Sequence, residues 1–309
     1  MPTTAVEVRV PATSANLGPG FDTMGLALAL YDRLVVEVVA GDGVVVAVTG
    51  VGAGEVATDA SNLVAKAIAR GFAHAGVPMP GLRITATNVI PHGGGLGSSA
   101  AAIVSGLMAA RGLLAPEIDL DADTLLALAT EMEGHPDNVA PALLGGLTIA
   151  WSEPTGARAK KLMVHRGVAP LVLVPDYAVS TELARSLQPA TVPYADAVFN
   201  LSRSALLVAA LVQSPELLFE ATEDRLHQHY RASAMPQTAG LIAELRAAGH
   251  AAVVSGAGPS VLVLAADPAQ RAAAAAIAAS RTDAAWRVLN LAVDFKGATV
   301  IERRVDATA

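Results

Sequence analysis

The chain contains no cysteine among its 309 residues. Disulfide bonds, a thiolate nucleophile and cysteine-ligated zinc are therefore excluded. The seven histidines are scattered, and none lies in the H-E-x-x-H spacing typical of a zinc hydrolase. The composition thus disfavours zinc chemistry as a whole.

Basic residues are also scarce. The 21 Lys and Arg against 28 Asp and Glu give a formal net charge of −7, with a sequence pI of about 5.5. A nucleic-acid surface needs clustered basic side chains, so we expect no nucleic-acid partner.

Long apolar runs are missing from the sequence as well. A membrane-spanning helix needs about 20 consecutive apolar residues, but the most apolar stretches, such as 25–30 and 272–279, are short or alanine-rich and bounded by charges. The opening residues MPTTAVEVRVPA show no basic region followed by an apolar one, as a secretory signal would. We therefore expect a cytoplasmic protein without membrane contact.

Hydrophobic residues make up 53% of the chain and the mean hydropathy is +0.47, so a large core is expected. The length allows two ordinary domains. Strand and helix patterns mix without a regular βαβ repeat, which favours an α+β fold. The turn-rich SEPTG at 152–156 predicts a boundary, giving domains 1–153 and 154–309.

Local patterns predict individual elements. Gly41-Asp42-Gly43 is typical of a hairpin turn between two strands, and Ser61 is a candidate helix cap. The expected strands are 6–10, 34–39, 44–48, 82–90, 143–151, 171–175, 251–254, 261–264 and 288–294. The expected helices are 62–75, 100–114, 122–132, 197–211, 236–247 and 268–280.

The segment PHGGGLGSSAA, residues 91–101, is the most informative stretch. Its glycines lie between a predicted strand and a predicted helix, where unpaired N–H groups and the positive end of the helix dipole favour an anion. It is not a Walker A loop, because no Lys precedes the serines. Ser98 and Ser99 have hydroxyls suited to phosphate oxygens or Mg²⁺.

Three further segments carry polar or glycine-rich patterns. EMEGHPDNVAP at 131–141 packs acidic and amide side chains beside a Pro that we expect to end the preceding helix, with Asp137-Asn138 readable as a simple Asx turn. PATSANLGPGFD at 11–22 follows a strand, and SGAGPS at 255–260 is a second glycine-rich turn. Glycine there lets the backbone approach a ligand or another loop closely.

Together these four motifs resemble the GHMP kinases. PHGGGLGSSAA is similar to the phosphate-binding motif of that family, and SGAGPS to its C-terminal glycine motif. PATSANLGPGFD and EGHPDNVAPALLGG resemble the branch whose members phosphorylate the amino acid L-homoserine. The resemblance runs from about Val8 to Val263. It implies an N-terminal domain like ribosomal protein S5 domain 2, a ferredoxin-like C-terminal domain, and ATP and Mg²⁺ as cofactors.

The resemblance also implies roles for individual residues. Asn62 and Leu63 would meet the adenine, and Arg185 and Arg231 would bind the substrate carboxylate. The ammonium and hydroxyl of the substrate would be surrounded by Asn16, Asp22, His135, Asp137 and Asn138. Three of these would act in catalysis by positioning the hydroxyl for the reaction: Asn138, Asp22 and Asn16. Ser98 or Ser99 would hold Mg²⁺ with Glu133, or with Glu131 instead. The loop that would wrap the phosphates consists of Pro91, His92, Gly93, Gly94, Gly95, Leu96, Gly97, Ser98 and Ser99.

Two other functions fit parts of the sequence. Gly95, Gly97 and Ala100 match the loose G-x-G-x-x-G/A pattern of nicotinamide-dependent oxidoreductases, which would leave EGHPDN unexplained. A non-catalytic sensor on the same fold would bind ATP or an amino acid without turnover. If the protein is a kinase, we expect it to form a homodimer. We also expect that replacing Gly95 by a residue with a side chain would fill the space of the phosphates and abolish nucleotide binding.

Overall fold

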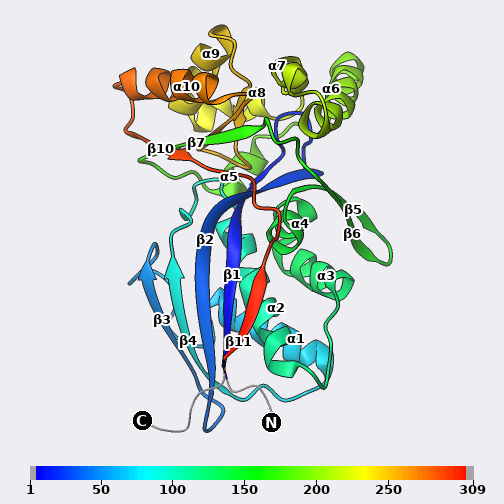
Figure 1. Cartoon of the computed structure of the whole chain (residues 1–309), viewed down its shortest axis with the longest axis vertical. Coiled ribbons are helices and arrows are strands. Elements are labelled where there is room, and N and C mark those ends of the chain that lie inside the picture. Colours follow the sequence, from blue (N-terminus) through cyan, green and yellow to red (C-terminus); the bar gives the residue numbers. More distant parts are fainter. Residues whose placement is uncertain (1–4, 304–309) are drawn as a thin grey trace.

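The computed structural model describes residues 5–303 and consists of two sheets, each with its own helices (Figure 1). The larger, seven-stranded sheet has the order β11-β1-β2-β4-β3, and β5 and β6 extend it from β2. Its strands are β1 (Ala5–Ala15), β2 (Met24–Val39), β3 (Val44–Gly50), β4 (Gly81–Asn88), β5 (Leu147–Glu153), β6 (Gly156–Leu162) and β11 (Thr299–Arg303).

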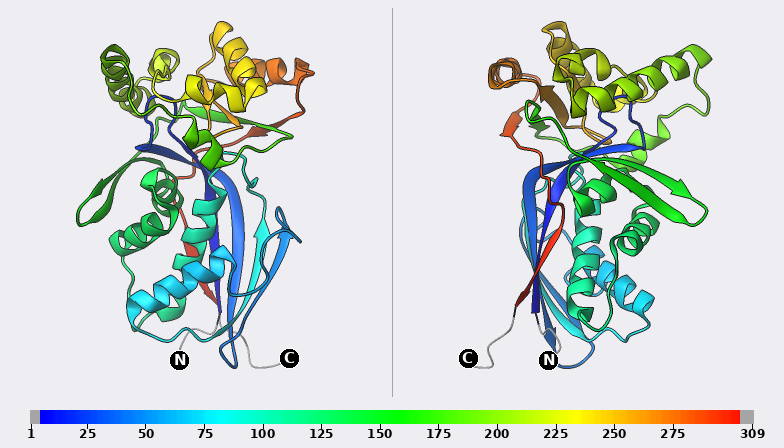
Figure 2. Two further views of the ribbon diagram at one scale, coloured as in Figure 1. Left: turned by 180° about the vertical axis from the view of Figure 1, so that it is seen from behind. Right: turned by 45° about the vertical axis from the view of Figure 1, so that its right-hand side comes forward.

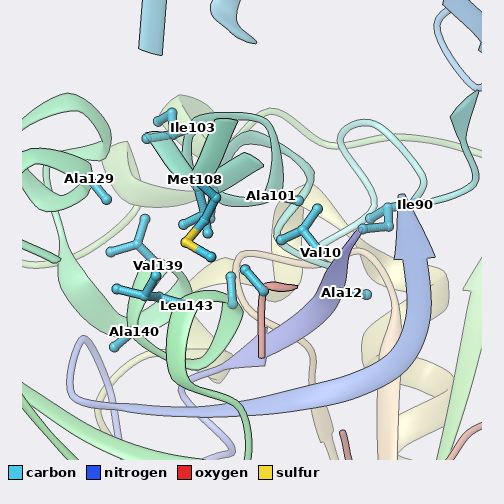
Figure 3. Close-up of a cluster of buried hydrophobic side chains, with 14 of the residues drawn as sticks. Val10, Ala12, Ile90, Ala101, Ile103, Met108, Ala129, Val139, Ala140 and Leu143 are labelled. Carbon is cyan, nitrogen blue, oxygen red and sulfur yellow. The ribbon is translucent and has the colours of Figure 1, made fainter. Parts of the chain in front are cut away.

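Four helices cover one face of this sheet, as both views of Figure 2 show. They are α1 (Leu63–Ala75), α2 (Ser98–Leu114), α3 (Ala122–Glu133) and α4 (Pro136–Leu144). Helix α2 is buried along most of its length because its Ala, Ile, Val, Leu and Met side chains pack on every side. Figure 3 shows Ile103 and Met108 of this helix in the same apolar cluster as Val10 of β1 and Val139 of α4. This core fixes the N-terminal end of α2, where the glycine loop ends.

The second sheet is antiparallel, with the order β10-β7-β9-β8. Its strands are β7 (Ala169–Pro175), β8 (Ala252–Val254), β9 (Val261–Ala265) and β10 (Trp286–Asn290). Around it lie α5 (Thr181–Ser186), α6 (Tyr194–Val212), η1 (Pro215–Leu217), α7 (Leu218–Ala221), α8 (Gln228–Arg231), η2 (Ala232–Ala234), α9 (Pro236–Ala247) and α10 (Pro268–Ser280). An α+β fold is thereby confirmed.

Some local predictions were wrong where distant segments decide the structure. The turn at 41–43 does not make a hairpin, because β4 lies between β2 and β3 and pairs with β3 in parallel. The expected strand 143–151 begins only at Leu147, since α4 occupies the residues before it. Helix α1 is capped by Asn62 rather than Ser61, whose hydroxyl binds Asp59.

The chain crosses between the sheets twice, so the expected boundary at 153/154 does not follow them. That boundary falls inside the β5–β6 hairpin, and both strands belong to the larger sheet. The expected last strand 288–294 ends as β10 at Asn290, and the chain then returns to pair β11 with β1. We therefore propose that the second domain is the segment between β6 and β11.

Candidate active site

The glycine loop forms a concave array of N–H groups ahead of α2. Gly93, Gly95 and Gly97 have φ of 61°, 74° and 70°, while Gly94 and Leu96 between them stay outside that left-handed region. Such alternation turns successive N–H groups toward one side and creates an anion-binding nest. Helix α2 has neither a side-chain cap nor an acidic residue in its first turn. Its first N–H groups are therefore available to an anion.

Three loops join at this point. The amide of Thr13 donates to Leu96 O at 3.1 Å, and that of Gly256 donates to Ala15 O at 3.1 Å. The Ser255 hydroxyl donates to Gly95 O at 2.7 Å. The loops 13–22, 91–99 and 255–260 are thus bonded pairwise, and each fixes the position of the others.

Gly95 lies directly against the backbone of the second glycine loop. A Cβ there would lie 2.2 Å from Ser255 O and 2.8 Å from Gly258 O, both backbone atoms that cannot turn aside. A side chain at Gly95 would therefore collide with the second glycine loop, a contact that the sequence alone did not indicate. The need for glycine here comes from loop packing.

We predict that Gly95→Ala separates the two loops, displaces the phosphate-binding amides and weakens ATP binding about tenfold or more, which corresponds to about 1.4 kcal/mol or more of binding free energy. Gly54→Ala is the matched control, because Gly54 has a similar φ of 80° but nothing within 4 Å of its missing Cβ. Its cost is limited to backbone strain of about 1–2 kcal/mol. Calorimetric ATP titration of both variants checks this, and equal affinities would refute it.

Beside the loop lies a cavity of about 120 Å³ that gathers most of the predicted substrate residues. It contains side chains from both domains and the phosphate loop itself. Its walls include Asn16, Pro91, Gly93, Gly94, Gly95, Gly97, Ser98, Ser99, Glu133, His135, Asp137, Asn138, Thr181, Arg185, Arg231 and Gly256.

The EGHPDN segment is a corner between two helices. Helix α3 ends at Glu133, Gly134 follows with φ 92°, and Pro136 is the first residue of α4. The proline therefore starts a helix as well as following one, and Asp137 lies in the first turn of α4 instead of an Asx turn. This corner turns the polar side chains of both helices toward the cavity.

Asp137 and His135 form a buried pair in this corner. The Asp137 side chain is 2% exposed, and its Oδ1 lies 2.7 Å from His135 Nδ1. The hydrogen bond to the Asp137 carboxylate raises the pKa of His135. Beside them the Thr13 hydroxyl donates to Asn138 Oδ1 at 2.8 Å, which leaves the amide nitrogen of Asn138 for a substrate.

Asn16 and Asp22 are tied into the loop framework. Asn16 Nδ2 donates to Gly256 O at 2.8 Å, and Asn16 Oδ1 accepts the Asp22 amide at 2.9 Å. Both polar atoms of Asn16 are therefore used, one to join two loops and one within its own loop. The Asp22 carboxylate accepts two hydrogen bonds from the Arg185 guanidinium, at 2.8 and 3.2 Å. This forked ion pair fixes the plane of Arg185 at the cavity wall.

Arg231, unlike Arg185, is a buried cation without an ion-pair partner among the described side chains. It is 1% exposed, donates to Gly256 O at 3.3 Å and lies 5.1 Å from the centroid of the Phe21 ring. Burial lowers the pKa of its guanidinium, although an arginine stays charged at neutral pH. Among the side chains that the structure describes, those of residues 5–301, no carboxylate forms an ion pair with it. A buried unpaired cation facing a cavity is a good partner for an anionic ligand.

Ser99 and Glu133 form the oxygen pair best placed for a metal. Ser99 Oγ donates to Glu133 Oε2 at 2.7 Å, and burial raises the pKa of the Glu133 carboxyl. Glu131 points elsewhere, to Arg70 at 2.8 Å, and its side chain is 63% exposed. Within residues 5–303 no cluster of three His, Cys, Asp or Glu side chains surrounds a metal position. A cation here would therefore complete its shell with water and phosphate oxygens, as Mg²⁺ commonly does.

A larger cavity of about 430 Å³ opens on the other side of the loop. Asn62, Leu63 and His92 line it together with apolar side chains of β1–β4 and with Ser98 and Ser99. The Asn62 amide is used locally, since it accepts from Val64 N at 2.9 Å and donates to Ala57 O at 2.7 Å. The size and the apolar walls suit a nucleoside next to the phosphate nest.

Sequence reasoning missed several supporting residues. Thr13 and Ser255 lie inside quoted motifs, yet their partners Asn138 and Gly95 are far away in the chain. Asp32 gave no signal, although its carboxylate accepts the amides of Val89 and Ile90 and so fixes the entry to the glycine loop. Burial raises the pKa of Asp32.

Two segments of the chain match known family models. Residues 62–146 match the N-terminal domain of the GHMP kinases and residues 205–282 match their C-terminal domain. The larger sheet and the antiparallel second sheet are the S5-like and ferredoxin-like parts expected of that fold. These matches define the class: a GHMP kinase, and hence a phosphotransferase that uses ATP.

Full-length relatives narrow the class. The chain is 67% identical to a homoserine kinase of Leifsonia xyli over 305 residues, covering 99% of this chain and 94% of that protein. It is 50% identical to a homoserine kinase of Streptomyces avermitilis, with 96% of both chains covered. A homoserine kinase structure from Cytophaga hutchinsonii superposes with a TM-score of 0.86 at 28% identity, over 96% of this chain and 98% of that one. The chain belongs to the homoserine kinase family of the GHMP kinases.

Proposed function

We propose that the protein transfers the γ-phosphoryl group of ATP to the side-chain hydroxyl of L-homoserine. The product, O-phospho-L-homoserine, leads to threonine. The observation that carries the proposal is the charge pattern of the smaller cavity. Buried Arg231 lacks a carboxylate partner, and the acidic Asp137 lies in the same cavity beside the phosphate loop. An amino acid supplies both a carboxylate for the first and an ammonium for the second.

In this proposal each wall of the cavity has a separate task. Arg231 binds the carboxylate, because a planar guanidinium can grip it with two hydrogen bonds. Arg185, whose two terminal nitrogens already bind Asp22, assists with its remaining N–H groups and its charge. Asp137, oriented by His135, binds the ammonium. The free amide nitrogen of Asn138 positions the hydroxyl beside the N-terminus of α2, where residues 93–99 bind the ATP phosphates and the larger cavity takes the adenine.

The donor set also fits a magnesium ion. Hydroxyl and carboxylate oxygens are ligands that Mg²⁺ prefers. The ion would be held by Glu133 together with Ser99, or together with the neighbouring Ser98 in place of Ser99. Bound there, the ion would neutralise negative charge on the transferring phosphoryl group. The loop amides stabilise the same charge without moving during the reaction.

A dedicated general base is absent from this mechanism. The Asp137 carboxylate is bonded to His135, and that of Asp22 to both arms of Arg185. Phosphoryl transfer through a loose transition state depends on alignment and charge neutralisation more than on deprotonating the nucleophile. Once the new phosphorus–oxygen bond is largely formed and the bond to ADP is broken, the hydroxyl proton passes to an oxygen of the transferred phosphoryl group and from there to water.

The test is an ADP-release assay with a panel of homoserine, mevalonate, galactose and shikimate. We expect turnover with L-homoserine and its loss in excess EDTA. Turnover of another alcohol instead, or full activity in EDTA, would refute the substrate or the metal. ATP or homoserine binding without turnover would indicate a sensor, and NADH binding without Mg²⁺ an oxidoreductase.

Helix α6 bears on membrane contact and assembly. Among residues 5–303 it is the one helix that is both long enough and apolar enough to cross a membrane. Only 22% of its apolar stretch is buried in the protein. One face is engaged, because Asn200 and Ser204 both donate to Pro19 O. The opposite face exposes Tyr194, Val198 and Leu201 at helical spacing, with 85%, 48% and 72% exposure. We propose a cytoplasmic homodimer in which a second copy covers this stripe.

We predict that Leu201→Glu dissociates this dimer, because a charge would be buried opposite its own symmetry mate. Val45→Glu is the matched control, since Val45 is 63% exposed on β3, outside the stripe. Sedimentation velocity at several concentrations reads the mass. A wild-type monomer, or dissociation by Val45→Glu alone, would contradict the proposed interface.

A further inference from the structure

The loop from Asn16 to Asp22 needs support from outside itself. Asn16, Leu17 and Asp22 have φ of 69°, 52° and 52°, the left-handed region that residues other than glycine rarely adopt. Each such residue costs roughly 1–2 kcal/mol, so the conformation persists only where surrounding contacts hold it. The loop provides Asn16, Phe21 and Asp22 beside Arg231 and Arg185. Whatever holds the loop therefore shapes the substrate cavity.

His227 is one of the supports, and it contacts the middle of the loop. Its side chain is fully buried, and Nε2 lies 2.8 Å from Gly18 O. A carbonyl oxygen only accepts, so Nε2 carries the hydrogen. The imidazole also stacks on Phe21, with ring centroids 4.9 Å apart and planes 18° apart. The same Phe21 ring lies against the guanidinium of Arg231.

The surroundings of His227 favour its neutral form. Nδ1 is buried without a hydrogen-bond partner, so a second ring proton would have no acceptor. Arg231 adds positive charge from the same segment, while Asp224, 3.6 Å from Nε2, and Asp22 add negative charge. The Asp224 carboxylate already accepts the amides of residues 226, 227 and 228. Burial outweighs the carboxylates and lowers the pKa of His227.

We propose that His227, as the neutral Nε2–H tautomer, is a positioning residue for homoserine: it holds the 16–22 loop through Gly18 and Phe21 and thereby places Arg231 and Arg185. This inference deepens the proposed function and depends on it for the identity of the substrate. His227 touches neither substrate. Its effect reaches the carboxylate pocket. The loop 91–99 on the ATP side keeps its position, because its backbone bond to this region comes from Thr13 in β1, ahead of the 16–22 loop.

Protonation of His227 therefore releases the loop. A proton on Nδ1 places a second buried cation beside Arg231 and has no acceptor to stabilise it. The KM for homoserine rises as the pH falls through the lowered pKa of His227. The KM for ATP stays level over the same range.

Two substitutions separate the hydrogen bond from the ring. His227→Phe keeps the stacking partner of Phe21 but has no donor for Gly18 O. His227→Gln keeps an N–H donor of similar reach and does not titrate. For both variants and the wild type, we would measure the KM for each substrate from pH 5 to pH 8 and amide hydrogen exchange of residues 16–24. Thermal unfolding would show whether each variant is folded.

We expect His227→Phe to raise the KM for homoserine about tenfold or more, the effect of leaving a buried carbonyl without its donor. The KM for ATP stays within about twofold, and the amides of Gly20 and Asp22, which bond to Asn16, exchange faster. His227→Gln restores the neutral-pH KM and removes the rise at low pH.

Four results would overturn the inference: an unchanged homoserine KM in His227→Phe, equal loss for ATP, unchanged exchange, or a low-pH rise that persists in His227→Gln. If His227→Phe does not fold, the pH profile and exchange of His227→Gln still decide. Wild-type turnover of homoserine tests the proposed function separately. Exchange needs no substrate, so it tests the support of the loop even where the proposed function fails.

Discussion

Replacing Glu133 by glutamine lowers kcat about a hundredfold or more, with a much smaller change in the KM for homoserine. The carboxylate lies 2.7 Å from the Ser99 hydroxyl at the start of α2, where the proposed magnesium ion and the ATP phosphates meet. An amide of the same shape removes the negative charge that holds the cation. Losing one electrostatic stabiliser of a transition state typically costs about 10²–10³ in rate.

Glu131→Gln is the matched control. Glu131 lies on the same helix, but its exposed side chain binds Arg70 away from the cavity, so its substitution should leave kcat unchanged. Steady-state kinetics as a function of Mg²⁺ concentration checks both variants, because the half-saturating concentration should rise only for Glu133→Gln. The opposite pattern would assign the metal to Glu131.

Arg231→Ala should raise the KM for homoserine roughly thirty- to several-thousand-fold, corresponding to about 2–5 kcal/mol for a lost buried partner of a charged group. The KM for ATP should change far less, because Arg231 lies against Phe21 and Gly256 on the substrate side. Arg231→Lys should recover only part of the loss, since an ammonium keeps the charge without the forked geometry.

Arg225→Ala is the control in the same segment. Its guanidinium is 51% exposed and pairs with Asp196 outside the substrate cavity, so both KM values should stay near the wild type. Kinetics with each substrate varied in turn distinguishes the cases. An equal rise for ATP and homoserine in Arg231→Ala would mean that this arginine supports the fold or the nucleotide.

Local chemistry predicted the parts of the site that are local. Glycines before an apolar helix indicate an anion site from sequence alone, and the loop with α2 has that structure. The helix begins at Ser98 and not at Ala100, because Gly97 in the left-handed conformation serves as its N-cap. Both serines therefore lie in the first turn.

Partnerships across the chain were beyond such reasoning. Pro136 reads as a helix stop, but whether a new helix begins there depends on packing against α3 and β5. The sequence around residues 22 and 185 does not indicate that Asp22 and Arg185 form an ion pair. The hydrogen bond from Asn16 to Gly256 likewise joins residues 240 positions apart in the sequence. Family motifs named these residues, while the bonds between them come only from the fold.

In the division of the chain that we propose, the return of β11 to β1 makes the second domain an insertion within the first. Ala5 pairs with Arg303, so the larger sheet gains its last strand only after the whole second domain has been synthesised. During translation one edge of β1 therefore stays unpaired until β11 has been synthesised. An unpaired strand edge can pair with strands of other chains. The high sequence separation of this pairing also slows folding, because a long loop must close first. A truncation before Thr299 would keep every residue of the proposed site yet leave the sheet open to aggregation.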